Sequence, residues 1–222
     1  MHTAIMGGTF NPIHLGHLRI AEEVKEYLDI SLLNACRDID KIIFIPSYLP
    51  PHKEDGSLIS PNHRLEMVKL AVRDNPDFQA SDVEIKRGGT SYSVKTLETL
   101  REEMPDTEIS FIVGTDSFNE ITIWCEYERL FELTNFIVVT RPGYPVKKID
   151  EILPDRMACK FGYDAARNVY VHDNGKTVTY MATTLIDISA SDIRKRVREG
   201  RSVRYLVPHD VEQYIMENRL YK

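Results

Sequence analysis

The 222-residue chain has few cysteines and no long apolar run, and each scarcity excludes a class of protein. Its three cysteines, Cys36, Cys125 and Cys159, are odd in number, widely spaced and never arranged as C-x-x-C. This pattern indicates free thiols in a reducing compartment rather than a disulfide framework or a zinc site. No stretch approaches the ~20 apolar residues of a membrane-spanning helix, and the first residues show no signal-peptide pattern. We therefore expect a cytoplasmic protein that does not associate with membranes.

The chain also lacks an excess of basic residues, because its formal net charge is -6. A protein that binds nucleic acid or an anionic membrane through its overall charge needs a basic face. The acidity argues against both partners and still allows a local basic site for one anionic ligand. The length permits one large core, so we expect a single domain over residues 1–222, with a C-terminal helical subdomain at about 189–222.

Short apolar runs alternate with helical patterns along most of the sequence. Strands are predicted at 4–6, 41–46, 78–85, 108–114 and 135–140, the last two being nearly continuous apolar runs typical of a parallel sheet buried on both faces. One helix is expected to begin at Ser60 and Pro61, and another to be capped by Ser91. The alternation predicts right-handed βαβ units in a doubly wound α/β fold, with the ligand site beyond the carboxyl ends of the strands.

The last third of the chain has a different pattern. In "VYVHDNGKTVTYM", β-forming residues alternate around Asn174-Gly175, which predicts a hairpin with a type I′ turn. A basic helix then follows, with Ser189 as its N-cap and Gly200 as its stop. A closing helix begins at Pro208.

A glycine loop follows the first strand. Gly7-Gly8-Thr9 allows backbone amides to approach a ligand, and the helix after the loop directs its N–H groups and positive dipole end to the same point. The loop therefore predicts a phosphate site, although its spacing matches neither the dinucleotide fingerprint nor the P-loop.

Two histidines, His14 and His17, stand three residues apart at the start of that helix and share a face. Gly16 between them leaves space for another group to lie against the backbone. Two imidazoles can donate hydrogen bonds to phosphoryl oxygens or bind a metal. No Glu-x-x-His or Cys partner supports zinc, so we favour phosphate.

Basic residues mark two further candidate anion sites. Arg194 lies near the start of its helix, where the dipole disfavours a cation, so an anion held with Ser189 and Ser191 would explain its position. Lys195, Arg196 and Arg198 are interpreted as a solvated face. His52-Lys53 is a second candidate phosphate clamp, the alternative being an exposed polar loop.

Together these residues resemble the nucleotidyltransferase superfamily that carries H-x-G-H and late I-S-S/T-x-x-I-R motifs. Within it, the chain is most similar to bacterial nicotinate-nucleotide adenylyltransferases. The similarity runs in order through "GGTFNPIHLGHL", "PPHK", "TSYSVKTL", "IVGTDSF", Trp124 and "DISASDIR". The chain departs from the family at Asn11 and Lys95, where Asp is usual or frequent. Its 168–181 hairpin also looks longer than usual, and a role for it in oligomer contacts stays open.

The resemblance implies a Rossmann-like nucleotidyltransferase fold and an enzyme of NAD biosynthesis. Such an enzyme transfers the adenylyl group of ATP, bound with Mg²⁺, to nicotinate mononucleotide, giving nicotinate adenine dinucleotide and pyrophosphate. The attacking phosphate is already ionised at neutral pH, so positioning and charge neutralisation carry the catalysis.

The resemblance also implies roles for particular residues. The catalytic residues would be His14, His17 and Arg194. The residues that contact ATP would be Gly7, Gly8, Thr9, Phe10, His17, Gly114, Asp116, Ile188, Ser189, Ser191 and Arg194. The acceptor would contact Lys53, Thr90, Ser91, Tyr92 and Trp124, with Trp124 stacked on the pyridine ring unless it is only a core anchor. Backbone N–H groups around Thr90 to Tyr92 and after Trp124 would receive the nicotinate carboxylate, and no protein residue is expected to bind a metal.

Several alternatives stay open at this point. The acceptor could be nicotinamide mononucleotide, or phosphopantetheine, whose enzymes are shorter and lack an element like Trp124. Class I aminoacyl-tRNA synthetases share H-x-G-H, but their lysine-rich second motif and RNA-binding domains are missing here. A catalytically silent nucleotide sensor is a third interpretation, against which the intact His14, His17 and Arg194 argue. The oligomeric state, including a homo-oligomer, is left open.

Overall fold

The protein is described by a computed structural model covering residues 1–30, 39–51, 58–140 and 143–222. Its strands are β1 (His2–Gly8), β2 (Lys41–Pro46), β3 (Phe78–Ala80), β4 (Glu108–Gly114), β5 (Asn135–Val139), β6 (Phe161–Asp164), β7 (Val169–His172) and β8 (Thr177–Met181). Its longer helices are α1 (Leu15–Ile30), α2 (Pro61–Val72), α4 (Ser93–Glu103), α9 (Ala190–Arg198) and α10 (His209–Glu217). Shorter helices are α3 (Val83–Arg87), α5 (Thr115–Phe118), η1 (Ile121–Ile123), α6 (Tyr127–Leu133), α7 (Ile149–Ile152) and α8 (Asp155–Ala158).

All the strands named above join one sheet in the order β3-β2-β1-β4-β5-β8-β7-β6. The first six in this order run parallel to one another, whereas at the edge β7 pairs antiparallel with β8 and β6 pairs antiparallel with β7. The prediction of a doubly wound Rossmann-like α/β fold is therefore confirmed, with a mixed rather than purely parallel sheet. The direction in which strands are added reverses at β1, because β2 and β3 lie on one side of it and β4 and β5 on the other.

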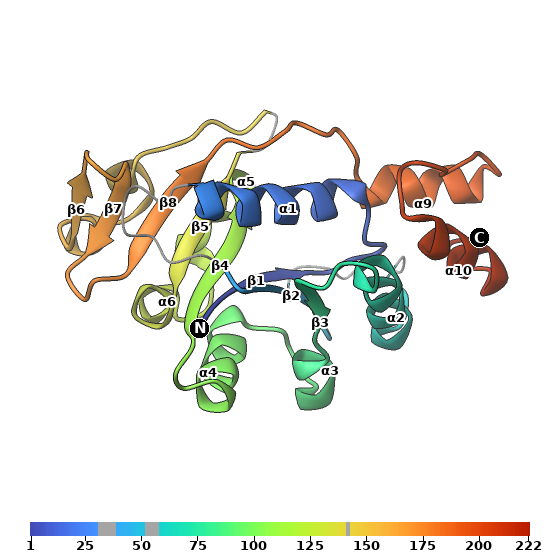
Figure 1. Cartoon of the computed structure of the whole chain (residues 1–222), viewed down its shortest axis with the longest axis horizontal. Helices are drawn as coiled ribbons and strands as arrows, with labels where there is room; N and C mark the ends of the chain where they lie inside the picture. The colour runs from blue at the N-terminus through green and yellow to red at the C-terminus, as the bar shows by residue number, and fades with distance from the viewer. Residues whose placement is uncertain (31–38, 52–57, 141–142) are drawn as a thin grey trace.

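Helices cover both faces of the sheet, and α1 lies on the opposite face from α3 and α4 (Figure 1). Successive strand residues alternate between two cores, as the pleat of a strand requires. In β1, Ala4 and Met6 enter one core and Ile5 enters the other. The central strands are buried along nearly their whole length, which agrees with their continuous apolar runs.

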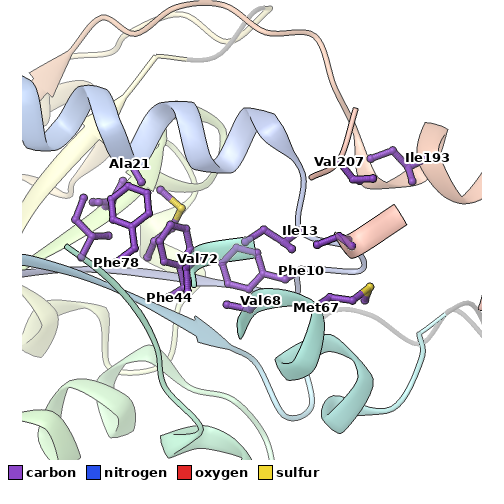
Figure 2. Packing of buried hydrophobic residues seen from close by; sticks show 14 of the residues in the cluster. Phe10, Ile13, Ala21, Phe44, Met67, Val68, Val72, Phe78, Ile193 and Val207 are labelled. Carbon is purple, nitrogen blue, oxygen red and sulfur yellow. The ribbon is translucent and has the colours of Figure 1, made fainter. Parts of the chain in front are cut away.

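The C-terminal helices share a core with the α/β part. Ile193 of α9 and Val207 belong to the same buried cluster as Phe10 and Ile13 of the loop after β1 and Val68 of α2 (Figure 2). The predicted Ser189 N-cap is confirmed, because its hydroxyl accepts a hydrogen bond from the Asp192 N–H at 3.1 Å. The loop after β1 is thus held between two helices that are distant in sequence.

Three local predictions were wrong. The predicted 78–85 strand ends at Ala80 and is followed by α3, whose first turn buries Val83 and Glu84. The predicted hairpin is present, but the Gly175 N–H bonds to the His172 carbonyl at 2.7 Å, and within this fully described turn only Gly175 has a positive φ, 87°. A type I′ turn needs positive φ at both central residues, so this turn is not of that type. The His172 N–H also bonds to the Lys176 carbonyl at 2.8 Å, which leaves a three-residue loop between them.

Ser91 is the third, because α4 begins at Ser93 with Tyr92 as its N-cap. The Ser91 Oγ instead accepts hydrogen bonds from the N–H groups of Tyr48 and Leu49, at 2.8 and 3.3 Å. The residue therefore joins two loops rather than capping a helix.

Two remaining expectations concern membranes and thiols. Within the described ranges, no helix is long and apolar enough to cross a membrane. Cys125 and Cys159 are free and exposed thiols, and Cys36 lies outside the described residues.

Candidate active site

The largest concentration of predicted site residues lines a cavity of about 520 Å³ beyond the carboxyl ends of β1 and β4. This is the point where the strand order reverses, which is where open α/β sheets bind ligands. The cavity is lined by Gly7, Gly8, Thr9, Phe10, His14, His17, Gly114, Asp116, Trp124, Ile188, Ser189 and Ser191, among other residues. Most of the residues expected to contact ATP are thus brought together.

At two positions of the site, neighbouring side chains leave little space for any residue larger than glycine. A Cβ on Gly8 would lie 3.1 Å from the Phe10 ring, and a Cβ on Gly16 would lie 3.1 Å from His14 Nδ1. The group that lies against the Gly16 backbone is therefore the His14 imidazole. Phe10 itself has a φ of 47°, an unfavourable value for a residue with a side chain, at the centre of the loop.

The two imidazoles stack, with ring centroids 3.7 Å apart and planes inclined by 29°. His14 lies just before α1, and its N–H donates to His17 Nδ1 at 3.3 Å. His17 thus occupies the position of the acceptor in a capping box, three residues into the helix. Because Nδ1 accepts this bond, the neutral His17 ring carries its proton on Nε2, which makes Nε2 a hydrogen-bond donor.

The N-termini of α1 and α9 meet at this cavity, and the two helices run away from it in opposite directions (Figure 1). Their positive dipole ends therefore face the same space, together with the Ser189 and Ser191 side chains that line it. Such an arrangement favours a ligand with more than one negative charge.

Arg194 connects α9 to the glycine loop. Its Nη1 donates to the Asn11 carbonyl at 2.9 Å, and its Nη2 lies 3.5 Å from the Ser191 hydroxyl. It is not among the described residues that line the cavity, and its Nη2 contact connects it to Ser191, which is. Lys195 is largely exposed and lies 4.0 Å from Glu199, as its assignment to the solvated face predicts.

Trp124 stands where the 520 Å³ cavity meets two further cavities, of about 220 and 610 Å³. Its ring is partly buried and packs against Phe111, with centroids 6.1 Å apart. Ser91 and Ser93 line both of these cavities, and Tyr92 lines the larger. Thr90 is paired with Leu49 in an isolated bridge and lines none of the three.

The backbone donors predicted around Thr90 to Tyr92 are largely occupied within the protein. The Ser91 N–H donates to the Leu49 carbonyl at 2.9 Å, and the Tyr92 N–H donates to the Thr90 carbonyl at 3.1 Å. Both groups are therefore engaged within the protein, and a contact between them and the carboxylate stays a prediction. Ser93, which the sequence reasoning missed, opens α4 and brings its hydroxyl and the N-terminal helix turn to the same cavities.

Arg64 is a second residue that was missed. Its side chain is fully buried and donates to three backbone carbonyls, those of Thr9 at 2.8 Å, Tyr48 at 3.0 Å and Ile59 at 3.2 Å. Burial lowers the pKa of the guanidinium to about 10, so the group is positively charged at neutral pH. Arg64 thus ties the glycine loop to both ends of the chain segment between Tyr48 and Ile59.

Three predicted features remain: the His52-Lys53 pair and the two departures from the family, Asn11 and Lys95. Lys53 and its neighbour His52 lie outside the described residues. Asn11, where the family usually has Asp, accepts a hydrogen bond from the Tyr221 hydroxyl at 3.0 Å. Lys95, the second departure, places its Nζ over the Tyr92 ring, 5.6 Å from the centroid.

Comparison with known proteins first defines the class. The model of the family described as Cytidylyltransferase-like matches residues 5–196. The fold, the cavity at the reversal of strand order and this match define a nucleotidyltransferase.

Curated relatives narrow the assignment. The chain is 48% identical over 221 residues to a probable nicotinate-nucleotide adenylyltransferase of Geotalea daltonii and 49% identical over 221 residues to one of Geobacter sp. strain M21. Both matches cover 100% of this chain and 98% of the relative. The protein belongs to the nicotinate-nucleotide adenylyltransferase family.

A solved structure supports the fold independently. The nicotinic acid mononucleotide adenylyltransferase of Plasmodium falciparum, complexed with NaAD, superposes with a TM-score of 0.69 over 99% of this chain and 97% of that chain. The two sequences are 17% identical, so the likeness concerns the fold.

Proposed function

We propose that the protein transfers the adenylyl group of ATP to nicotinate mononucleotide, forming nicotinate adenine dinucleotide and pyrophosphate in NAD biosynthesis. The single observation that carries this proposal is that a cavity suited to phosphates adjoins a cavity beside Trp124. A cavity faced by two helix N-termini and two histidines shares Gly7, Gly8 and Trp124 with a second cavity on the acceptor side. A triphosphate and an aromatic acceptor can therefore meet at the glycine loop.

The chemistry is an in-line displacement at the α-phosphorus of ATP. A phosphate oxygen of the acceptor forms a bond to this phosphorus as the bond to the bridging oxygen breaks, and pyrophosphate leaves with the electron pair. The acceptor phosphate is already ionised, so the protein needs no covalent nucleophile. Its contribution is to position the reactants and to neutralise charge.

His17 is the residue best placed to stabilise the developing charge. Its Nδ1 is held by the His14 N–H, which orients the ring before the substrate arrives and leaves Nε2–H as the donor. His14 and the N-termini of α1 and α9 would hold the neighbouring phosphates. Ser191 would bind the β/γ end of ATP, with Arg194 supporting it through the Nη2–Oγ contact.

Mg²⁺ is proposed to enter bound to ATP. Among the described residues, no group of three or more His, Cys, Asp or Glu side chains could hold a metal ion. The ion would keep several water ligands and bind mainly through the substrate phosphates. The ion would neutralise phosphate charge. Asp116, which lines the same cavity, would contact the ribose or adenosine of ATP.

The acceptor would lie between the glycine loop and Trp124. The pyridine ring would stack on Trp124, and the carboxylate would reach the hydroxyl of Ser93 and the first turn of α4. A carboxamide would direct its own N–H groups at these donors, at a cost of about 1–3 kcal/mol for each unsatisfied group. The site should therefore prefer nicotinate mononucleotide to nicotinamide mononucleotide.

Pyrophosphate release, measured with ATP, Mg²⁺ and one acceptor at a time, tests the function. We expect turnover with nicotinate mononucleotide well above that with nicotinamide mononucleotide or phosphopantetheine. Faster turnover with phosphopantetheine, or no turnover with any acceptor, would contradict the proposal.

A further inference from the structure

Glu84 is a buried acidic residue that the reaction described above does not use. It lies in the first turn of α3, and only 7% of its surface is exposed. Its side chain lines the cavity of about 220 Å³ on the acceptor side, together with Gly7, Gly8 and Trp124. A carboxylate is rarely buried this deeply unless its oxygens are satisfied.

One of its two oxygens is firmly held. The Thr96 hydroxyl donates to Glu84 Oε1 at 2.6 Å, and Arg87 donates to the same hydroxyl with both Nη atoms at 3.1 Å. The Arg87 Nη2 also lies 4.0 Å from Oε1. This chain of contacts fixes the direction of the carboxyl group.

The other oxygen, Oε2, is buried and accepts no hydrogen bond from the residues that the structure describes. Leaving such an acceptor unsatisfied carries the full cost of removing a charged group from water, so a donor is expected in the complex. Because the oxygen belongs to a side chain that lines the cavity, a bound molecule can supply this donor.

The chemistry of the acceptor limits which donor this can be. On the proposed function, on which this inference rests, the acceptor is nicotinate mononucleotide. At neutral pH its phosphate and carboxylate are predominantly hydrogen-bond acceptors, and its two ribose hydroxyls are the donors. The ribose also joins the phosphate to the pyridine ring, and the cavity that Glu84 lines reaches both the glycine loop and Trp124, where these two ends would lie.

We propose that Glu84 is a substrate-positioning residue whose Oε2 accepts a hydrogen bond from a ribose hydroxyl of the acceptor nucleotide. Thr96 and Arg87 hold the carboxyl group in the orientation that this contact requires. The contact orients the ribose so that the phosphate at its other end points to the glycine loop. It also favours a ribonucleotide over a 2′- or 3′-deoxyribonucleotide.

The test is a double-mutant cycle between the protein and the substrate. The wild type and Glu84→Gln are each assayed with nicotinate mononucleotide and with its 2′-deoxy and 3′-deoxy forms. We expect one deoxy form to lower kcat/KM of the wild type about 10- to 100-fold, the scale of a hydrogen bond to a charged group. Glu84→Gln should cause a comparable loss with the natural acceptor and less than about a threefold further loss with that deoxy form, because the two changes remove one interaction.

Glu98→Gln is the matched control. Glu98 lies on α4, pairs with Arg129 at 2.6 Å and lines none of the three cavities around Trp124. Its substitution should leave the KM for every acceptor unchanged. Equal losses from Glu84→Gln with all the acceptors would show a structural role and overturn the inference.

The deoxy acceptors with the wild type alone give a second measurement, which does not depend on how the variant folds. If both deoxy forms react as fast as the natural acceptor, no ribose contact exists and the inference is wrong. Failure of the proposed function would look different, because the wild type would then not turn over nicotinate mononucleotide itself.

Discussion

The two sides of the site are built in different ways. On the glycine-loop side, residues Gly7 to His17 with the starts of α1 and α9, the loop and its histidines are arranged by contacts between residues close in sequence, and Arg64 and Arg194 attach them to distant segments. The His14 N–H bonds to His17, and the Phe10 ring covers Gly8. The Trp124 side, formed by Trp124 with the loops after β2 and before α4, is joined by contacts across 40 or more positions, such as those of the Ser91 hydroxyl with Tyr48 and Leu49.

This difference follows from the two tasks. Phosphates are recognised by backbone N–H groups and helix dipoles, which a single strand-loop-helix unit provides. A ribose and a pyridine ring need side chains at several separate points, and these must come from several elements. We therefore expect substitutions on the glycine-loop side to change kcat, and substitutions on the Trp124 side to change the KM for the acceptor.

The largest effect is expected at His17. His17→Ala removes the Nε2 donor and should lower kcat about 100- to 1,000-fold, as the loss of one preorganised donor does. His17→Asn separates the two functions of the ring, because its side-chain oxygen can still accept from the His14 N–H while the Nε2 donor is lost. We expect steady-state kinetics to show a similar fall in kcat for both variants and thermal denaturation to show a lower Tm for His17→Ala only. Recovery of kcat in His17→Asn would mean that the residue acts only as a cap.

Arg64 is expected to have the next largest effect, because it touches both sides. Arg64→Met leaves the carbonyls of Thr9, Tyr48 and Ile59 without their donor, at about 1–3 kcal/mol for each buried group left unsatisfied. We expect kcat/KM to fall about 100-fold for ATP and for the acceptor alike. Arg64→Lys should recover part of the loss, because it keeps the charge but cannot donate to all three carbonyls in the same geometry. Loss confined to one substrate would show that Arg64 does not link the two sides.

Trp124 tests the acceptor side by itself. Trp124→Ala should raise the KM for nicotinate mononucleotide about 10-fold, within the range for stacking a base on an aromatic ring, and leave the KM for ATP nearly unchanged. Trp124→Phe, which keeps an aromatic face, should recover most of the affinity. Unfolding of the alanine variant, or unchanged acceptor kinetics, would favour the core-anchor interpretation.

The same contrast explains how much of the structure could be predicted from the sequence. The alternation of strands and helices follows from alternating apolar runs and helical patterns, and the glycine loop, the histidine pair and the Ser189 cap depend on residues within a few positions of one another. Local chemistry decides these features, so a short window of sequence contains the information. The predictions for Arg194 and Lys195 also used only the helix on which they lie.

The features that were missed depend on partners that a sequence does not reveal. Arg64 looks like any helical arginine, because its partners are backbone carbonyls of three separate segments. Glu84 has the alternation of a strand in "VEIKR", and its burial arises from packing between α3 and α4. The donors around Ser91 and Tyr92 were predicted as available because their pairing with Leu49 and Thr90 is a matter of how the loops fold.

The smallest effect is expected at Glu23, which connects α1 to a segment distant in sequence. Glu23 of α1 accepts hydrogen bonds from the Thr184 N–H and from Arg19 Nε, both at 2.7 Å. Thr184 lies in the segment between β8 and α9, which lines a cavity of about 190 Å³ beside His14 and His17. Glu23→Gln should lower the free energy of unfolding at neutral pH by about 1–2 kcal/mol, with little change in kcat.

The pH dependence of this loss identifies its origin. Burial alone would raise the pKa of Glu23, but the hydrogen bonds from Thr184 and Arg19 outweigh it, so the pKa lies below its ordinary value. A carboxyl whose pKa is lower in the folded state stabilises the fold above the pKa of the unfolded chain, and this stabilisation is lost as the pH falls through the folded pKa.

Urea denaturation should therefore show a difference in the free energy of unfolding between wild type and Glu23→Gln at neutral pH. This difference should shrink below the ordinary pKa of glutamate. Glu26→Gln is the control, since the exposed ion pair of Glu26 with Arg19 at 3.2 Å contributes little at any pH. If the difference in the free energy of unfolding were constant across this range, Glu23 would act through its shape, and its charge would not stabilise the glycine-loop side.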